Sequence, residues 1–214
     1  MEPAAPPPEN ATQTAVLRAT LRREKIAARA ALAQEVRAAH SARIETTLEA
    51  LLDKLRAVPP APTFRSTLGF CWPHQGEFDA RPLVQRLLAR GWDACLPVVL
   101  AEAAPLAFRP WTPETPLAPD RYGIPTPSAG EFVTPDVLLI PLVAVDARNY
   151  RIGYGGGFFD RTLAALAAAG HCATSIGVGF ELARVSDTRP GPRDIPLDLV
   201  ITELGCCIAR DLAQ

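Results

Sequence analysis

The sequence has no long hydrophobic run. None of its windows approaches the roughly 20 consecutive apolar residues that a membrane-spanning helix needs, so we expect no membrane partner. Residues 1–14 also lack the basic start and apolar middle of a secretory signal. They are acidic and rich in proline and alanine instead, which predicts a disordered tail ahead of a single domain at residues 15–210.

Cysteine and histidine are scarce, and their spacing excludes most disulfide and metal frameworks. The chain has 5 cysteines and 3 histidines. No C-x-x-C pair is present, the number of cysteines is odd, and the histidines are scattered. This pattern is typical of reduced thiols and does not indicate a zinc site. We therefore expect a cytoplasmic protein.

An excess of one charge is also missing. The formal net charge is −1 over 214 residues, which argues against nonspecific nucleic-acid binding because phosphate backbones attract strongly basic surfaces. Hydrophobic residues make up 48% of the chain, enough for a sizeable core. We expect a small-molecule substrate, no nucleic-acid partner and a monomer, although no residue pattern specifies the oligomeric state.

Helix-like and strand-like segments alternate along the chain. Apolar spacing predicts helices at residues 15–31, 34–57, 80–90 (with Asp79 as N-cap) and 159–169. Short apolar runs predict strands at residues 67–72, 94–100, 106–111, 137–145, 175–180, 199–202 and 205–209. Prolines predict a long loop at 112–135, of a kind that is often functional. The alternation predicts an α/β fold, a single three-layer α/β/α domain with a mostly parallel or mixed central sheet and the N-terminal helices packed on it.

Four glycines lie within residues 153–157, after Arg151 and before Arg161. The cluster matches neither standard nucleotide signature, because G-x-x-x-x-G-K-[ST] is absent and the third glycine of G-x-G-x-x-G would fall at Phe158. One interpretation is a flexible turn. However, glycines let backbone N–H groups approach an anion at the positive end of the next helix, and arginines suit phosphate oxygens. We therefore predict a phosphate-binding loop.

Other charged residues could complete such a site. Arg18 and Arg22 project to the same side of a helix, where like charges are unfavourable unless an anion lies between them, although they could simply form a solvated face. Glu77 follows the carboxyl end of a strand, where open α/β sheets bind ligands. Asp160, in the first turn of a helix, could complement the helix dipole or hold Mg²⁺ beside phosphates.

Residues 151–161 resemble the R-[LI]-G-Y-G-G-G-Y-Y-D-R signature of the 5-formyltetrahydrofolate cyclo-ligases, also called 5,10-methenyltetrahydrofolate synthetases. The resemblance covers residues 17–204 in the family's order. Its other elements are K-x-x-L-R at 18–22, G-E-[VF]-D-x-x-P-[LI] at 76–83, G-I-P-x-P at 123–127, the strand at 138–146, and H-D-x-x-x-D at 193–198.

The resemblance implies a reaction and its co-substrates. Such enzymes close 5-formyltetrahydrofolate to 5,10-methenyltetrahydrofolate with ATP and Mg²⁺, and release ADP and phosphate. The γ-phosphoryl group would go to the formyl oxygen, and N10 of the folate would then attack the activated carbon. The protein would mainly align two substrates and neutralise phosphate charge.

The resemblance also implies site residues. Those binding ATP would be Arg18, Arg22, Arg151, Ile152, Gly153, Tyr154, Gly155, Gly156, Gly157, Phe158 and Phe159. Those binding the folate would be Trp72, Glu77, Tyr154, Gly155, Gly156, Gly157 and Phe158. Mg²⁺ would be held by Asp160 and Asp194, and the catalytic residues would be Arg151 and Tyr154.

Four positions depart from the family's pattern. Arg18 replaces a lysine, Phe158 and Phe159 replace paired tyrosines, and Arg193 replaces a histidine. Lysine and arginine differ in geometry, and the two missing hydroxyls bear on the choice of substrate. Two alternatives therefore stay open: an ATP-using relative acting on another formylated or pterin-like compound, and a non-catalytic module that binds folate or nucleotide.

Overall fold

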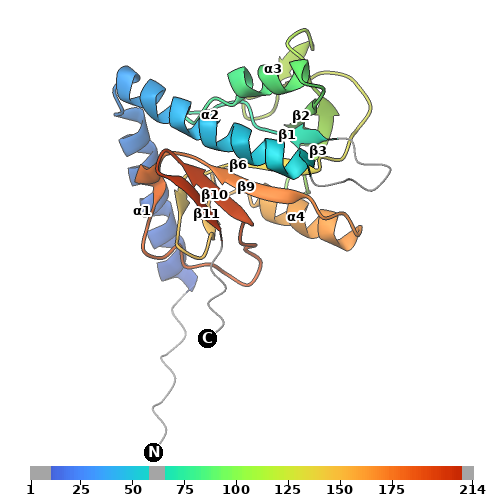
Figure 1. Cartoon of the computed structure of the whole chain (residues 1–214). Coiled ribbons are helices and arrows are strands. Elements are labelled where there is room, and N and C mark those ends of the chain that lie inside the picture. Colours follow the sequence, from blue (N-terminus) through green and yellow to red (C-terminus); the bar gives the residue numbers. More distant parts are fainter. Residues whose placement is uncertain (1–10, 58–65, 209–214) are drawn as a thin grey trace, which may run out of the picture.

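The computed structural model describes residues 11–57 and 66–208 (Figure 1). Within these residues the helices are α1 (Ala11–Ala30), α2 (Gln34–Ala57), α3 (Arg81–Ala89), α4 (Phe158–Ala168) and the short 3-10 helix η1 (Glu181–Ala183). In the part of the chain that is described, no helix is long and apolar enough to cross a membrane.

Seven strands form one mixed sheet in the order β11-β10-β9-β6-β1-β2-β3. Their bounds are β1 Thr67–Gly69, β2 Asp93–Val98, β3 Ala107–Pro110, β6 Val137–Pro141, β9 Thr174–Val178, β10 Leu199–Thr202 and β11 Gly205–Ile208. The five central strands run parallel, and β3 and β11 pair antiparallel at the two edges. The mixed sheet predicted from the sequence is thus confirmed.

Helices cover both faces of this sheet. Ile44, Leu48 and Leu52 of α2 are fully buried and join Leu83 of α3 in the apolar cluster on one face. Leu163 of α4 belongs to the cluster on the other face. Figure 1 shows α2 lying across the sheet, with α4 on a different side. This is the predicted three-layer α/β/α architecture, because each layer buries the apolar side of its neighbour.

The direction of the chain changes between the two strands at the centre of the sheet. From β1 the chain passes through α3 to β2 on one side, whereas from β6 it passes through α4 to β9 on the other side. Open α/β sheets bind ligands at the carboxyl ends of the strands, where two such directions diverge. The fold therefore places a ligand site beyond Gly69 and Pro141, the last residues of β1 and β6.

Two predicted segments differ in the structure. The strand predicted at 137–145 is divided into β6 and β7 (Ala144–Val145), because β7 leaves the main sheet and pairs antiparallel with β8 (Arg151–Ile152). The loop predicted at 112–135 contains a hairpin formed by β4 (Leu117–Pro119) and β5 (Pro125–Pro127). Its prolines lie at strand ends in a two-stranded sheet, where a missing N–H donor is tolerated.

Two predicted boundaries also differ. α1 begins at Ala11, so residues 11–14 of the predicted disordered tail are helical, and residues 1–10 lie outside the described residues. The N-cap of α3 is Ala80, and Asp79 lies one residue earlier. The carboxylate of Asp79 accepts a hydrogen bond from the N–H of Arg81 (3.0 Å) and binds the guanidinium of the same residue. Asp79 therefore supports the first turn without being its N-cap.

Candidate active site

The turn between β7 and β8 positions the glycine loop. Asp146 is fully buried in this turn, and its Oδ1 accepts hydrogen bonds from the N–H groups of Arg148 (2.9 Å) and Tyr150 (3.2 Å). Its Oδ2 accepts hydrogen bonds from the N–H and the hydroxyl of Thr188. One carboxylate therefore fixes the turn against the segment around residue 188, and the chain enters β8 at Arg151.

The glycine loop, residues 153–157, connects β8 to α4. Gly155 has a φ of +100° and Gly157 a φ of +63°, in the region that favours glycine. A Cβ on Gly156 would lie 2.6 Å from the ring of Phe158. Three positions thus admit only glycine without strain or collision, so the loop has a defined shape, unlike a flexible turn.

The backbone N–H groups of the loop indicate a ligand-binding site. Among the described residues, no acceptor is found for the N–H groups of Tyr154, Gly155, Gly156 and Gly157. α4 begins directly after them and has no side-chain cap. Successive unpaired amides at the positive end of a helix form an anion-binding site. The geometry thus supports the predicted phosphate-binding loop.

Two arginines of α1 contact the segments around this loop. Arg22 Nε donates a hydrogen bond to the carbonyl oxygen of Gly153 at 2.7 Å. Arg18 donates hydrogen bonds to the carboxylate of Asp194 and to the carbonyl oxygen of Arg189. Burial, and secondarily the charge of Arg18, lower the pKa of Arg22. Each arginine has its own protein partner, so their parallel orientation does not by itself require an anion.

Arg151 is buried against the first turn of α4. Its Nη2 lies 3.1 Å from Oδ1 of Asp160, and its Nη1 donates a hydrogen bond to the carbonyl oxygen of Ile195 at 3.0 Å. Burial lowers the pKa of Arg151, and the Asp160 carboxylate opposes this effect. Asp160 also accepts a hydrogen bond from the N–H of Ile195 at 3.0 Å, so it connects α4 to the segment that carries Asp194.

Asp194 supplies the second carboxylate near the loop. Its Oδ2 accepts hydrogen bonds from the N–H of Gly191 (2.7 Å) and from Arg18. Burial by itself would raise the pKa of Asp194, but these hydrogen bonds and the charges of Arg18 and Arg151 lower it overall. The structure thus brings both predicted metal ligands close to the charge of Arg151.

A second group of polar side chains lies beyond the carboxyl ends of β1 and β6. The hydroxyl of Tyr154 donates a hydrogen bond to Oε1 of Glu77 (2.8 Å) and accepts one from Nη2 of Arg29 (2.7 Å). Arg29 also donates hydrogen bonds to the carbonyl oxygens of Leu142 (3.0 Å) and Gln75 (3.1 Å). Because Leu142 directly follows β6, the group lies at the ligand site predicted by the topology.

Glu77 and Arg29 form the charged centre of this group. Glu77 is 8% exposed and Arg29 5% exposed, and their nearest charged atoms are 3.9 Å apart. Burial raises the pKa of Glu77, while Arg29 and the hydrogen bond from Tyr154 oppose the rise. Burial and the nearby Glu77 raise the pKa of Tyr154. Tyr154 is therefore a neutral donor, and its ring is exposed to solvent at the edge of the loop.

Aromatic side chains surround the exposed part of the loop. The ring of Phe158 lies 6.0 Å from that of Tyr122, which comes from the turn between β4 and β5. Trp72, on the connection from β1 to α3, packs under the guanidinium of Arg81, 4.4 Å from its ring centre. Trp72 thus shares a segment with Glu77, but its observed neighbour is an arginine of α3.

Two predicted ATP-binding residues have side chains in or against the core. Ile152 is fully buried in β8. Phe159 is partly buried and packs against the apolar cluster that contains Leu163, and the guanidinium of Arg151 lies 6.0 Å from its ring centre. These side chains can influence the shape of the loop only from the side of the core.

Sequence reasoning missed three residues of this region. Arg29 binds Tyr154, the ring of His74 packs edge-on against Tyr154 at 5.5 Å, and Tyr122 packs on Phe158. A signal for Arg29 was present, because Arg18, Arg22, Lys25 and Arg29 recur at spacings that place them on one helix face. His74 and Tyr122 lie in turns, where no periodic pattern marks a neighbour.

The glycine loop separates these residues into two sides. We name the two sides after the ligands that the sequence predicts for them. The phosphate side is the group formed by the loop amides, Arg18, Arg22, Arg151, Asp160 and Asp194. The pterin side is the group formed by Glu77, Tyr154, Arg29, His74 and Trp72. Tyr154 belongs to the loop and to the pterin side, so a ligand on one side touches the segment that borders the other. Such a site suits transfer of a group between two bound molecules.

Comparisons with known proteins show which family the chain resembles. The model of the 5-formyltetrahydrofolate cyclo-ligase family matches residues 14–203. A 5-formyltetrahydrofolate cyclo-ligase of Escherichia coli K12 is 33% identical over 156 residues, which are 70% of this chain and 84% of the relative. The relative from Haemophilus influenzae is 37% identical over 94 residues, which are 41% of this chain and 50% of the relative.

Solved structures show the same fold. The 5,10-methenyltetrahydrofolate synthetase of Aquifex aeolicus superimposes with a TM-score of 0.69 and 26% identity, covering 92% of this chain and 95% of its own. The synthetase of Mycoplasma pneumoniae gives a TM-score of 0.65 at 23% identity, covering 87% and 98%. Because the family model spans most of the sequence and the Escherichia coli relative is similar over more than two thirds of it, the chain belongs to the 5-formyltetrahydrofolate cyclo-ligase family.

Proposed function

We propose that this chain converts 5-formyltetrahydrofolate to 5,10-methenyltetrahydrofolate at the expense of ATP. The observation that carries the proposal is the position of Tyr154. It lies in a loop of unpaired amides and also binds Glu77 and Arg29 at the carboxyl ends of β1 and β6. One short segment therefore borders an anion site and a site for a flat polar ring.

The reaction needs an activated formyl group, because a formamide carbon is a poor electrophile and its oxygen a poor leaving group. The bond between the β- and γ-phosphates of ATP breaks, and the γ-phosphoryl group bonds to the formyl oxygen. N10 then attacks the formyl carbon with its lone pair and loses its proton. The carbon–oxygen bond breaks, phosphate leaves, and the ring closes as the methenyl product.

The phosphate side supplies the charge stabilisation for this transfer. The loop amides at the positive end of α4 donate hydrogen bonds to the phosphate oxygens, and Arg151 neutralises developing charge. A hydrogen bond to a charged group contributes about 1.5–3 kcal/mol. On the pterin side, the carboxyl group of Glu77 accepts hydrogen bonds from the ring N–H and amino groups of the folate, and Tyr154 with Trp72 offers flat apolar surface.

The carboxylates near Arg151 fit Mg²⁺ that arrives with ATP. Among the described residues, no three or more His, Cys, Asp or Glu side chains could together hold a metal ion. Mg²⁺ is commonly bound by one or two carboxylates together with substrate phosphates. Asp160 and Asp194 supply that number, and the bound ion would neutralise phosphate charge. Their side chains are each 20% exposed, so both can be reached from solvent.

The direct test is an absorbance assay. Purified protein with ATP, Mg²⁺ and 5-formyltetrahydrofolate is expected to produce the near-ultraviolet absorbance of the methenyl product and one ADP per turnover. Omission of ATP, or addition of EDTA, should abolish the signal. If folded protein hydrolyses ATP with another formylated compound and not with 5-formyltetrahydrofolate, the proposed substrate is wrong.

A further inference from the structure

The segment at residues 188–197, called here the Asp194 loop, carries one of the two proposed metal ligands between two points of attachment. The first point is Thr188, whose N–H (3.2 Å) and hydroxyl (2.8 Å) donate hydrogen bonds to Oδ2 of Asp146. Thr188 is 1% exposed and Asp146 is fully buried, so water does not compete for these bonds. The upstream end of the Asp194 loop is therefore fixed to the turn between β7 and β8.

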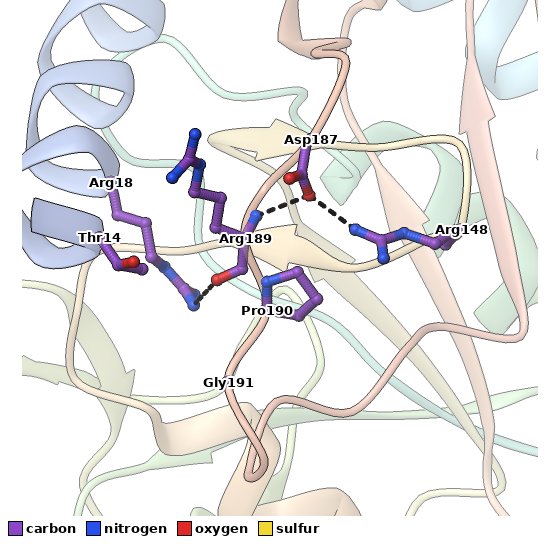
Figure 2. Close-up of a pocket in the computed structure, with 7 residues that line it drawn as sticks. All are labelled: Thr14, Arg18, Arg148, Asp187, Arg189, Pro190 and Gly191. Carbon is purple, nitrogen blue, oxygen red and sulfur yellow. Dashed lines mark hydrogen bonds and ion pairs between the residues drawn. The ribbon is translucent and has the colours of Figure 1, made fainter. Parts of the chain in front are cut away.

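Figure 2 shows further contacts at this upstream end. Oδ1 of Asp187 accepts hydrogen bonds from Arg148 (2.6 Å) and from the N–H of Arg189 (2.9 Å). The carbonyl oxygen of Arg189 accepts one from Arg18 (3.3 Å). The side chains of Asp187 and Arg148 are half exposed, so their ion pair contributes less to the attachment than the buried hydrogen bonds do.

Asn149 holds the downstream end of the Asp194 loop through both main-chain groups of Leu197. Its carbonyl oxygen accepts a hydrogen bond from the N–H of Leu197 (3.1 Å), and its Nδ2 donates one to the carbonyl oxygen of Leu197 (3.1 Å). The N–H of Asn149 in turn donates a hydrogen bond to the carbonyl oxygen of Asp146 (3.1 Å). One turn, residues 146–149, thus holds both ends of the Asp194 loop.

The side-chain amide of Asn149 acts only as a donor. Asn149 is fully buried, and its Oδ1 has no partner among the described residues. A buried acceptor without a partner is unfavourable, and glycine would adopt the φ of +62° at this position without that cost. The hydrogen bond from Nδ2 to Leu197 is therefore what asparagine contributes here and glycine would not.

The same turn leads into the phosphate side. Arg151 follows Asn149 by two residues, and its Nη1 donates a hydrogen bond to the carbonyl oxygen of Ile195 within the Asp194 loop. We infer that Asn149 is a positioning residue, which keeps Asp194 beside Asp160 in the arrangement that a shared Mg²⁺ needs. Mg²⁺ demands near-ideal octahedral geometry, so a carboxylate on a displaced loop binds it less well. The inference rests on the proposed function, because it assumes that Mg²⁺ binds there with ATP.

Two variants loosen the Asp194 loop at its opposite ends. Asn149→Gly removes the Nδ2 donor and tolerates the positive φ. Thr188→Val removes the hydroxyl with little change in shape, and Thr188→Ser keeps the hydroxyl as its matched control. Leu48→Ala weakens the core between α2 and the sheet, so it controls for loss of stability alone.

Hydrogen exchange without any ligand tests the attachment itself. In Asn149→Gly and Thr188→Val, the amides of residues 188–197 are expected to exchange about fivefold faster than in the wild type, the effect of losing about one net hydrogen bond. In Thr188→Ser they should stay within about twofold of the wild type. Residues 44–52 of α2 are the internal reference for global unfolding.

The Mg²⁺ requirement tests the positioning role. In Asn149→Gly and Thr188→Val, the Mg²⁺ concentration for half-maximal activity should rise by about fivefold, less than the roughly 10–100-fold typical of residues that contact a metal ligand directly. The KM for 5-formyltetrahydrofolate should stay within about twofold of the wild type. Thr188→Ser and Leu48→Ala should leave the Mg²⁺ requirement unchanged, because neither loosens the Asp194 loop.

Two results would overturn the inference. Unchanged exchange of residues 188–197 in both loosening variants would show that the turn does not hold the Asp194 loop. Faster exchange with an unchanged Mg²⁺ requirement would show that the attachment is structural and does not position Asp194. If the wild type forms no methenyl product, the proposed function fails and the positioning role fails with it, whereas faster exchange in the variants would still show that the turn holds the loop.

Discussion

At the scale of single residues, Arg29 and Glu77 form the charged centre of the pterin side. Glu77 is buried, and burial alone favours its neutral form. Arg29 is the cation that opposes this effect, and it holds the hydroxyl of Tyr154 at the same time. The motif at residues 76–83 identifies Glu77 from the sequence. Its counter-ion comes from α1, far away in the chain, so no local pattern pairs the two residues.

Replacing Arg29 with glutamine should shift the pH dependence of the reaction. Without the cation, the pKa of Glu77 rises further, so the acid limb of kcat/KM for 5-formyltetrahydrofolate is expected to move to higher pH. In this variant, the pKa of Glu77 in the folded protein lies further above its pKa in the unfolded chain. Protonated Glu77 therefore makes its full contribution to the free energy of unfolding below about pH 4.3. That contribution is lost as the pH rises through the folded pKa. Urea unfolding between pH 4 and pH 8 measures this loss.

Arg29→Lys is the matched control for this experiment, because it keeps the charge and loses the forked geometry. The acid limb of kcat/KM should shift less in Arg29→Lys than in Arg29→Gln, relative to the wild type. If the two variants shift the limb equally, hydrogen-bond geometry and not charge governs Glu77, and the electrostatic account is wrong.

Replacing either proposed metal ligand should change the Mg²⁺ requirement. Asp160→Asn and Asp194→Asn each keep the shape of the side chain but remove its charge. We expect the Mg²⁺ concentration for half-maximal activity to rise by at least about 10-fold, the lower limit seen when even indirect partners of a metal are lost. Asp53→Asn, on the exposed side of α2, is the control. An unchanged Mg²⁺ requirement in both variants would exclude these carboxylates as ligands.

At the scale of elements, α1 and α2 are attached to the sheet by different forces. Of the described side chains of α1, only that of Arg29 is buried. α1 is held mainly by hydrogen bonds from Arg18, Arg22, Lys25 and Arg29 to loop carbonyls and carboxylates. α2 instead buries a row of leucine and isoleucine side chains. Local opening should therefore be easier for α1.

ATP should protect α1 from hydrogen exchange. If opening of α1 removes Arg18 and Arg22 from the nucleotide, bound ATP opposes that opening. At a ligand concentration of about 100 Kd the expected stabilisation is about 2.7 kcal/mol, or about 100-fold slower exchange. Mass spectrometry of residues 15–30 measures it, with residues 44–52 of α2 as the internal reference. Unchanged exchange of residues 15–30 in the presence of ATP would show that α1 does not contact the nucleotide.

The glycine loop allows a controlled test of backbone conformation. Gly155→Val and Gly157→Val each place a branched side chain at a positive φ, which costs about 1–2 kcal/mol or more. Gly170→Val imposes the same strain at a φ of +73°, where nothing lies within 4 Å. All three variants should lose stability, but only the two loop variants should lose ATP binding. ATP affinity retained in Gly157→Val would refute the phosphate-loop assignment.

The elements predicted from the sequence agree with the structure where one pattern governs a whole segment. The helix predicted at 34–57 is α2, because its apolar positions repeat with the helical period. The division of residues 137–145 was missed, because β7 is set by pairing with β8 and by the distant Thr188 that binds Asp146. The signature likewise could not show that Phe159 packs against the core, since it does not tell which side of α4 a residue occupies.

At the scale of the whole molecule, the site lies where the two halves of the sheet diverge. The connection from β1 to α3 carries Glu77, His74 and Trp72 of the pterin side, and the segment from β6 through the glycine loop to α4 carries the loop amides, Arg151 and Asp160 of the phosphate side. α1 contacts both halves, through Gln75 on one and Leu142, Gly153 and Asp194 on the other. Ligands that bind between the halves should therefore stabilise the complete fold, not one element.

Leu48→Ala tests this global coupling, because Leu48 is fully buried between α2 and the sheet and belongs to neither side of the site. Loss of its side chain should lower the free energy of unfolding by about 2–5 kcal/mol. ATP with Mg²⁺, at an ATP concentration of about 100 times Kd, should raise the free energy of unfolding of the variant by about 2.7 kcal/mol. It should raise that of the wild type by the same amount. Thermal and urea unfolding with and without ATP measure both effects. The same ATP should not stabilise Gly157→Val, and equal stabilisation of that variant would show that the nucleotide binds elsewhere.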